Sequence, residues 1–408
     1  MPALARPGSL AVALSVSLWG GLCGLPKGTA AAEPPHSAPT NPLTYDARVV
    51  GLAGAGVACA DGGAASLHNP AQLQRTQQVS GSLSFTPYLV QLSAPFRFGR
   101  STIVQKKTGL LFGPFAQMGL AVRLHERVVV GMNGFLTGAA GGTFANVPLN
   151  AFSDEAPRGV VGNVDAGQFA GEVQVPLAVR VTRWLDLGVA YRLTQAYTFA
   201  STTSLRGAPL ADVSLRGTHL RGLQVGATSR IGEAVTLALG YRSEVRLDLS
   251  GSRRDYAPAD RSGAYRLADG YRTPHQVRAG ASYRPRALPS VLAIVEGHAE
   301  FYRRMDRRER DTFGGQLAGE LTPLPWLDLR AGFGAATQPL TDRYAMQTAP
   351  PPSMGYSLSS GAGIRLARWR LDLALAYVTS GKYVRRNATP GRYAAEGLVA
   401  SASATYVL

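Results

Sequence analysis

Residues 234–250 read AVTLALGYRSEVRLDLS, and apolar and polar side chains alternate along this stretch. One face is expected to carry Leu237, Leu239, Tyr241, Val245, Leu247 and Leu249, and the other Ala238, Gly240, Arg242, Glu244, Arg246 and Asp248. A repeat of two residues is that of a β-strand whose two faces meet different surroundings. Residues 184–194 and 369–378 alternate in the same way. The chain is therefore predicted to be all-β, either a sandwich or a barrel.

The order of turns and loops separates these two architectures. Short turns at 183–184, 232–233, 286–289 and 368–369 alternate with long polar loops, and aromatic residues such as Trp184, Trp326 and Trp369 lie near strand ends. Outer-membrane barrels have short turns at one end, long loops at the other and aromatic girdles. We therefore predict a 14-stranded antiparallel transmembrane β-barrel in the bacterial outer membrane. Its strands are expected near 79–90, 115–124, 127–137, 171–182, 184–200, 218–231, 234–250, 274–285, 290–302, 312–322, 326–338, 355–367, 369–380 and 396–408.

The N-terminal residues have the features of a secretory signal peptide. Arg6 precedes an apolar stretch at 10–25, and the small residues 30–32 offer a cleavage site. No later apolar run is long enough for a membrane-spanning helix. We expect a signal peptide at 1–32, an N-terminal lead and hatch at 33–77, and the barrel at 78–408. Cys59 would be the only cysteine left after cleavage, which excludes a disulfide within the chain.

The formal net charge is +16, and arginine supplies nearly all of the positive charge. The arginines are scattered over polar strand faces and loops, and no nucleic-acid-binding motif accompanies them, so no nucleic-acid partner is predicted. We expect arginine–carboxylate networks inside the barrel and contacts with outer-membrane lipid and lipopolysaccharide outside it. The loop cluster at 303–310 is interpreted as solvated or facing lipopolysaccharide.

The sequence offers no catalytic or cofactor-binding constellation. The six histidines lack the spacing of metal ligands, and there is no nucleophile elbow or phosphate-binding loop. Ser282 and His275 fall on opposite strand faces by parity, so they do not form a catalytic pair. We therefore predict that the protein is not an enzyme and binds no metal or cofactor.

Residues 49–77 are rich in small side chains, carry little charge and lack the strand pattern. Such a segment can fold into a barrel lumen as a plug, because glycine lets its backbone lie close to the wall. The segment ends in the tripeptide Asn69-Pro70-Ala71.

Four stretches resemble the FadL/TodX family of outer-membrane transporters for long-chain fatty acids and hydrophobic compounds. They are GLAGAGVACADGGAASLHNPAQL (51–73), LALGYRSEVRLDLSG (237–251), TPHQVRAGASYRP (273–285) and GRYAAEGLVASASATYVL (391–408). The first is similar to the family's hatch and the last to its closing strand. The chain departs from the family in ending on Leu408 where a terminal Phe is usual. The resemblance implies a fourteen-stranded barrel with a hatch in its lumen.

The resemblance also implies where function resides. The hatch and gate residues are expected to include Gly54, Asp61, Asn69, Pro70 and Ala71. A kink in the third strand gives the family a lateral opening, and the corresponding candidates are Gly131, Asn133 and Gly134. These residues are also compatible with ordinary barrel curvature.

A fatty-acid carboxylate would need a cation on the inner wall. Strand parity predicts that Arg192, Arg242 and Arg246 face inward, and these three are the candidates for binding substrate. Apolar residues at 138–170, including Phe144, Val147, Leu149, Phe152, Val160 and Val161, are expected to form an outer capture groove or to fold over the mouth.

We therefore predict a monomeric outer-membrane channel for uptake of hydrophobic small molecules, above all long-chain fatty acids. It would capture them outside and release them past the hatch or through the wall. The alternative is a structural or non-selective barrel without a dedicated substrate. The sequence leaves a fatty acid and an aromatic hydrocarbon both open as the substrate.

Overall fold

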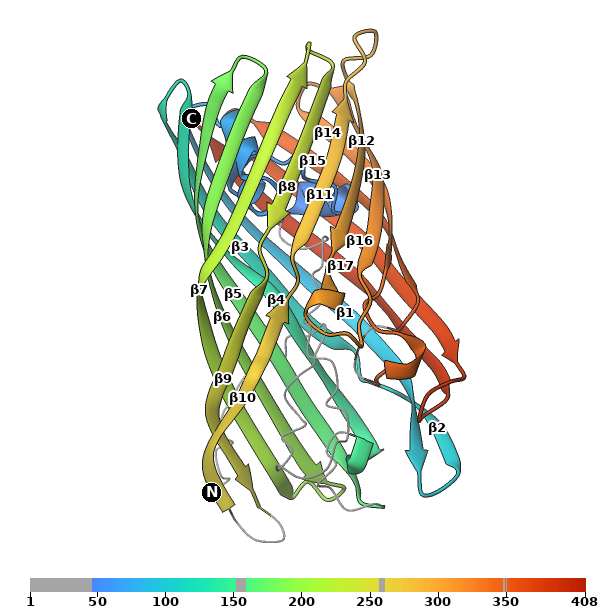
Figure 1. Ribbon diagram of the computed structural model, residues 1–408. Coiled ribbons are helices and arrows are strands. Elements are labelled where there is room, and N and C mark those ends of the chain that lie inside the picture. Colours follow the sequence, from blue (N-terminus) through green and yellow to red (C-terminus); the bar gives the residue numbers. More distant parts are fainter. Residues whose placement is uncertain (1–45, 152–158, 257–260, 348, 350) are drawn as a thin grey trace, which may run out of the picture.

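The computed structural model describes residues 46–408 apart from 152–158, 257–260, 348 and 350. These residues form an antiparallel sheet that closes into a tall barrel (Figure 1), because β17 (Gly391–Val407) pairs with β1 (Val79–Phe98). The other strands are β2 (Thr102–Lys107), β3 (Leu111–His125), β4 (Val128–Pro148), β5 (Val161–Thr182), β6 (Leu185–Ser204), β7 (Pro209–Ile231), β8 (Val235–Arg242), β9 (Val245–Asp255), β10 (Arg261–Thr273), β11 (Gln276–Tyr283), β12 (Val291–Glu300), β13 (Thr312–Leu324), β14 (Leu327–Thr337), β15 (Met354–Leu366) and β16 (Trp369–Val384).

These strands occupy fourteen positions around the barrel, because three positions each hold two collinear segments. β2 and β3 both pair with β1, and β8 and β9 both pair with β7. β10 pairs with β9, and β11 pairs with β8. The last interruption falls at Pro274, whose ring nitrogen has no proton for the ladder. The predicted count of fourteen is therefore confirmed.

Several strands are much longer than the sequence predicted. β1 has 20 residues, β5 has 22 and β7 has 23, whereas about 10 residues suffice to cross a membrane. The sequence left 138–170 and 251–273 between its predicted strands, as loops, and this is wrong: β4, β5, β9 and β10 run through most of both ranges. Small residues such as those at 138–142 carry no alternation, yet they still pair through their backbones.

The two ends of the barrel differ. The short-turn end has tight connections at 126–127 and 367–368, and the chain ends there. The loop end carries the long hairpins and the 3₁₀ turns η3 (Leu149–Ala151), η4 (Tyr302–Arg304) and η5 (Asp342–Tyr344). Trp184, Trp326 and Trp369 lie in or beside the short turns and are about half exposed. They form the girdle predicted for that end.

The outer wall between the ends is apolar. Large exposed side chains include Leu317, Leu358 and Leu373, which point away from the lumen. A closed barrel with an apolar outer band satisfies its backbone internally while facing lipid, and this is the architecture of an outer-membrane protein. No helix in the described part of the chain is long and apolar enough to span a membrane.

Residues 46–77 fold inside the barrel at the short-turn end (Figure 1). They form α1 (Ala47–Gly51), η1 (Gly62–Ala64), α2 (Ala65–His68) and η2 (Pro70–Arg75). Almost every described side chain between Asp46 and Gln74 is buried. We call residues 46–77 the hatch.

Candidate functional site

At several places the hatch lies directly against a wall glycine. A Cβ on Gly188 of β6 would lie 2.3 Å from the backbone nitrogen of Ala71, and a Cβ on Gly332 of β14 would lie 2.7 Å from the carbonyl carbon of Leu52. Wall glycines on β3, β7, β8 and β11 face hatch atoms equally closely. Glycine is required at such sites because only a hydrogen fits between the two backbones.

Asn69 fixes the end of the hatch to the wall. Its Oδ1 accepts a hydrogen bond from Ala71 N at 3.0 Å and thereby caps η2. Its Nδ2 donates to the Ala227 carbonyl at 3.0 Å and to Thr228 Oγ1 at 3.1 Å, both on β7. Pro70 occupies the first position of η2, where no N–H is needed. The tripeptide Asn69-Pro70-Ala71 thus joins the hatch to β6 and β7, and its role as a gate remains a prediction.

Asp61 lies at the centre of an ionic network between hatch and wall. It accepts hydrogen bonds from Arg370 of β16 at 2.6 Å and from Arg48 of α1 at 2.9 Å. Burial alone would raise the pKa of Asp61, but the charges of Arg370 and Arg48 outweigh burial and hold this pKa well below its usual value. The carboxylate therefore stays ionised, and the network holds the hatch to β16.

The network continues along the inner wall. Arg48 also binds Glu320 of β13 at 2.8 Å, and Arg330 of β14 binds Glu320 at 2.7 Å. Arg330 further binds Asp372 of β16 at 2.6 Å. The expected arginine–carboxylate network inside the barrel is present.

Two further contacts hold the middle of the hatch. Glu296 of β12 accepts hydrogen bonds from Gly56 N at 2.7 Å and from Val57 N at 2.8 Å. His68 Nδ1 lies 2.7 Å from the Arg278 guanidinium of β11. Burial, followed by the charges of Arg278 and Arg242, lowers the pKa of His68 well below its usual range, so the neutral ring can accept this hydrogen bond.

Gly54 shapes the exit from α1. Its φ of 89° follows an Ala53 φ of 54°, and both lie in the left-handed region that favours glycine. Its N–H donates to the Val49 carbonyl at 2.9 Å. This geometry ends the helix and turns the chain toward η1.

Two of the three candidate substrate arginines neutralise the same carboxylate. Arg192 of β6 donates to Glu172 of β5 at 2.7 Å, and Arg242 of β8 donates to the same carboxylate at 3.1 Å. Arg242 also donates to the Leu67 carbonyl of the hatch at 3.3 Å. Both arginines face the lumen as predicted, but they lie beside the hatch and bind Glu172.

The prediction that Arg246 faces the lumen is wrong. Beyond Ser243 and Glu244 the alternation of the strand inverts, so that Val245, Leu247 and Leu249 are buried while Arg246 is exposed. Two adjacent exposed residues of β7, Leu220 and Arg221, form a bulge at the same level. An extra residue in a strand exchanges its inner and outer faces. Arg246 binds Glu244 at 3.3 Å on the outer surface.

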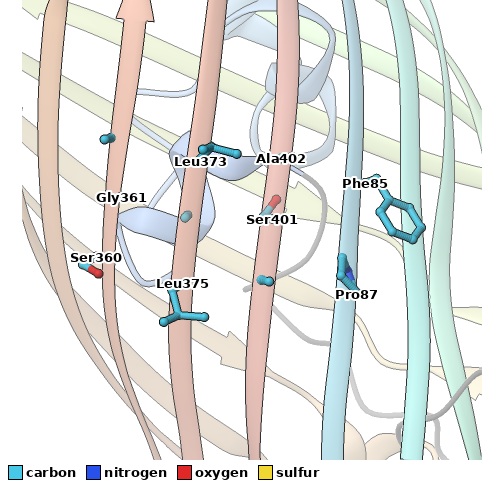
Figure 2. Close-up of a pocket in the computed structure, with 11 residues that line it drawn as sticks. Phe85, Pro87, Ser360, Gly361, Leu373, Leu375, Ser401 and Ala402 are labelled. Carbon is cyan, nitrogen blue, oxygen red and sulfur yellow. The ribbon is translucent and has the colours of Figure 1, made fainter.

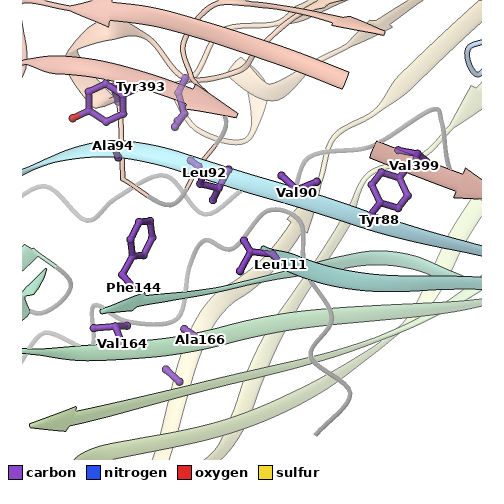
Figure 3. Packing of buried hydrophobic residues seen from close by; sticks show 14 of the residues in the cluster. Tyr88, Val90, Leu92, Ala94, Leu111, Phe144, Val164, Ala166, Tyr393 and Val399 are labelled. Carbon is purple, nitrogen blue, oxygen red and sulfur yellow. The ribbon is translucent and has the colours of Figure 1, made fainter. Parts of the chain in front are cut away.

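Toward the loop end the inner wall becomes apolar (Figure 3). The residues that line it are buried and come from strands near the barrel seam. Tyr88 packs on Phe115 with ring centroids 4.8 Å apart, and Phe96 packs on Phe144 at 5.2 Å. We call this surface the apolar lining. It comprises Tyr88, Val90, Leu92, Phe96, Leu111, Phe115, Phe135, Phe144, Val147, Leu149, Val164, Tyr393 and Val399, and Val50 and Leu67 of the hatch adjoin it.

Part of the apolar lining could have been inferred from the sequence. Tyr88, Val90 and Leu92 alternate with Leu89 and Gln91, and their inward face could be inferred from the polar serines that precede them on the same face of β1. Phe144, Val147 and Leu149 were expected in an outer loop, whereas they point inward from β4 and η3. Phe152 lies outside the described residues.

The wall loses its hydrogen bonds beside the apolar lining. β3 and β4 pair from His125 and Val128 as far as Gln117 and Phe135. Beyond that point β4 pairs only with β5, and β3 pairs only with β1, among the residues that the structure describes. The two strands still lie close together there, since a Cβ on Gly142 of β4 would lie 3.7 Å from Leu111 Cδ1 of β3. We call this place the wall gap.

The candidate lateral-opening residues lie on the hatch side of the wall gap. Gly131, Asn133 and Gly134 all pair with β3. Asn133 is buried and donates to Ser66 Oγ of the hatch at 2.8 Å. Asn133 therefore couples the third strand to the hatch, next to the point where the strands part.

A groove of about 600 Å³ lies on the wall at the barrel seam (Figure 2). Phe85, Leu373 and Leu375 border it, and the small residues Ala400 and Ala402 form part of its lining. Ladder pairs between β1 and β17 are missing at Pro87, which lacks an N–H. The exposed leucines place the groove on the side that faces lipid.

No protein-family model matches the chain, and no curated protein matches it. Solved structures do. A FadL homologue of Pseudomonas aeruginosa aligns with a TM-score of 0.70 and 14% identity over 90% of this chain and 98% of its own. The chain has the fold of the FadL and TodX channels. The P. putida toluene transporter TodX aligns with a TM-score of 0.67 and 12% identity over 89% of this chain and 98% of its own. The Ralstonia pickettii toluene transporter TbuX aligns with a TM-score of 0.64 and 14% identity over 90% of this chain and 99% of its own.

The described residues contain no group of three or more histidine, cysteine or acidic side chains that could hold a metal ion. Cys59 is a buried free thiol, and burial raises its pKa to about 12, so it is not a reactive thiolate.

Proposed function

We propose that this protein is an outer-membrane channel for uptake of hydrophobic small molecules. The observation that carries the proposal is the apolar lining above a lumen closed by the hatch. The lumen of a non-selective porin is polar and filled with water. A purely structural barrel needs neither a hatch held by ion pairs nor an apolar inner surface.

The wall gap offers a route for lateral release. Unpaired strand edges in contact with lipid are costly, because their backbone groups lack partners. In this protein the edges part beyond Phe135, where Leu111 and Phe115 of β3 and Phe144 of β4 belong to one buried apolar cluster. A hydrophobic molecule could leave between β3 and β4 without displacing the hatch, which makes lateral release the simpler path.

The lining supports an uncharged substrate more strongly than a fatty acid. A buried carboxylate requires a cation, yet Arg192 and Arg242 are shared with Glu172, and Arg246 is outside. The lining residues themselves are aromatic and aliphatic. TodX and TbuX, which share the fold, are named as toluene transporters. We therefore place neutral hydrocarbons first and keep long-chain fatty acids as the second candidate.

Uptake of labelled toluene and oleate by cells that lack their own hydrophobic-compound channels tests this proposal. Phe144→Ala should reduce toluene uptake roughly ten-fold, since one ring of an apolar binding surface contributes about 1–3 kcal/mol. Phe313→Ala is the matched control, because Phe313 is 59% exposed on the outer wall whereas Phe144 is fully buried. Equal uptake by both variants would refute the role of the lining.

A third variant tests whether Arg192 binds the carboxylate of a fatty acid. Arg192→Gln should leave toluene and oleate uptake in the same ratio as in the wild type, because Arg192 is already neutralised. A selective loss of oleate uptake would instead assign Arg192 to a fatty-acid site. Heat-modifiable migration on gels confirms that each variant barrel has folded.

A further inference from the structure

Four arginines gather on the outside of the barrel, on β7, β9 and β10. They are Arg216, Arg221, Arg246 and Arg266, and all are exposed. Ser250 of β9 pairs with Arg216 on one side and with Arg266 on the other, so these three residues form one row across three strands. Neighbouring strands lie about 4.8 Å apart, which brings Arg216 and Arg266 within reach of one ligand. We call the four residues the arginine surface.

These arginines face outward because the strand faces exchange at this level. Below the bulge at Leu220 and Arg221, the outward residues of β7 include Leu223 and Val225. Above it, Leu215 turns inward and Arg216 turns outward. The outer wall thus changes within a few residues from an apolar surface to a basic one.

Part of this charge is not neutralised by the protein. Arg246 binds Glu244 at 3.3 Å, and Arg266 contacts Asp248. In the described part of the chain, Arg216 and Arg221 make no hydrogen bond or ion pair through their side chains. The surface therefore keeps two guanidinium groups available to an anion.

The surface lies at the boundary where lipid headgroups are expected. Tyr197 pairs with Arg216 across β6 and β7, is exposed, and stacks with Phe169 at 6.2 Å between ring centroids. Phe199 stacks with Phe169 at 5.9 Å. Aromatic clusters mark the interface between the apolar core of a membrane and its headgroups.

We propose that the arginine surface binds the phosphate groups of a phosphorylated glycolipid in the outer leaflet, namely lipid A of lipopolysaccharide. Guanidinium groups bind phosphate through paired hydrogen bonds, and the apolar wall below would accept the acyl chains. The loop cluster at 303–310 is also basic, but Arg308 is paired with Asp306, and the cluster lies in the connection between β12 and β13 instead of on a strand face. The assignment rests on the outer-membrane orientation of the proposed channel and not on its substrate.

The test uses the full-length barrel in detergent micelles and fluorescent lipid A as the probe. The triple variant Arg216→Gln, Arg221→Gln, Arg246→Gln should bind lipid A at least ten-fold more weakly than the wild type, since each arginine contributes roughly 1 kcal/mol near an anionic lipid surface. The control triple Arg303→Gln, Arg304→Gln, Arg307→Gln removes the same charge from exposed loop residues and should bind within two-fold of the wild type.

Two further probes identify the source of the phosphate. Dephosphorylated lipid A should bind no better to the wild type than to the arginine-surface triple, and millimolar inorganic phosphate should not displace lipid A. Displacement by inorganic phosphate would show a site for free anions and overturn the lipid assignment. Equal lipid A binding by both triples would overturn the location. Toluene uptake is measured separately, so failure of the lipid site leaves the proposed transport function standing.

Discussion

At the short-turn end of the lumen, buried arginines and carboxylates join the hatch to at least four strands, as in the contacts of Asp61 with Arg370 and of Glu296 with Gly56. At the loop end, the inner wall carries Phe96, Phe144 and their apolar neighbours, and adjacent strands part without a ladder. Directional bonds between charged groups define one geometry, and breaking such a bond leaves a buried charge without its partner, which costs free energy. Apolar contacts are non-directional and tolerate guests of different shape. The first region is suited to closure and the second to passage.

Removing the first region should have the largest effect. Deletion of residues 49–77 should raise the conductance of the barrel to small ions in planar bilayers from near zero to that of an open pore, because the hatch fills the lumen at the short-turn end. Hydrocarbon uptake should still depend on Phe144 in the deleted protein. Unchanged conductance would show that other residues block the lumen, and the division into a closing and a passing region would be wrong.

A smaller change should loosen the closing region without removing it. Gly188→Ala places a methyl group 2.3 Å from Ala71 N and should destabilise the seated hatch by about 1–3 kcal/mol. Transient ion leak should therefore rise about ten-fold or more. Gly81→Ala on β1 is the control, since a Cβ there meets nothing within 4 Å. A leak that is the same in both variants would contradict tight backbone contact between hatch and wall.

The smallest expected effect concerns pH. Burial, and then the charge of Asp372, raise the pKa of Asp46 at the start of α1 to about 6. A raised carboxyl pKa means that the cost of keeping the carboxylate buried is absent below its ordinary value of 3.8 and fully present above about 6. The seated hatch should therefore be more stable at pH 5 than at pH 7.5, by on the order of 1–2 kcal/mol.

Hydrogen-exchange protection of the α1 amides, corrected for the intrinsic rate, measures this difference. Asp46→Asn should abolish the pH dependence while keeping an oxygen that can accept from Arg48 N, as Asp46 does at 2.8 Å. The apolar lining, which has no such group among its residues, should show no change in protection over the same range. Persistence of the pH dependence in Asp46→Asn would assign it to another group.

The sequence by itself determined the number of strands, the positions of the short turns, and the place of the hatch segment before β1. These features are local, because the period of two and the turns depend only on residues that are close together in the chain. The tertiary structure alone decided that Glu172 holds both Arg192 and Arg242, since these residues are far apart in the chain. It also decided that Arg246 faces outward, because the strand is interrupted at Ser243 and Glu244, beside the bulge of β7, and its inner and outer faces exchange there. Periodicity records that two faces differ, whereas only the register between strands assigns one face to the lumen and the other to lipid.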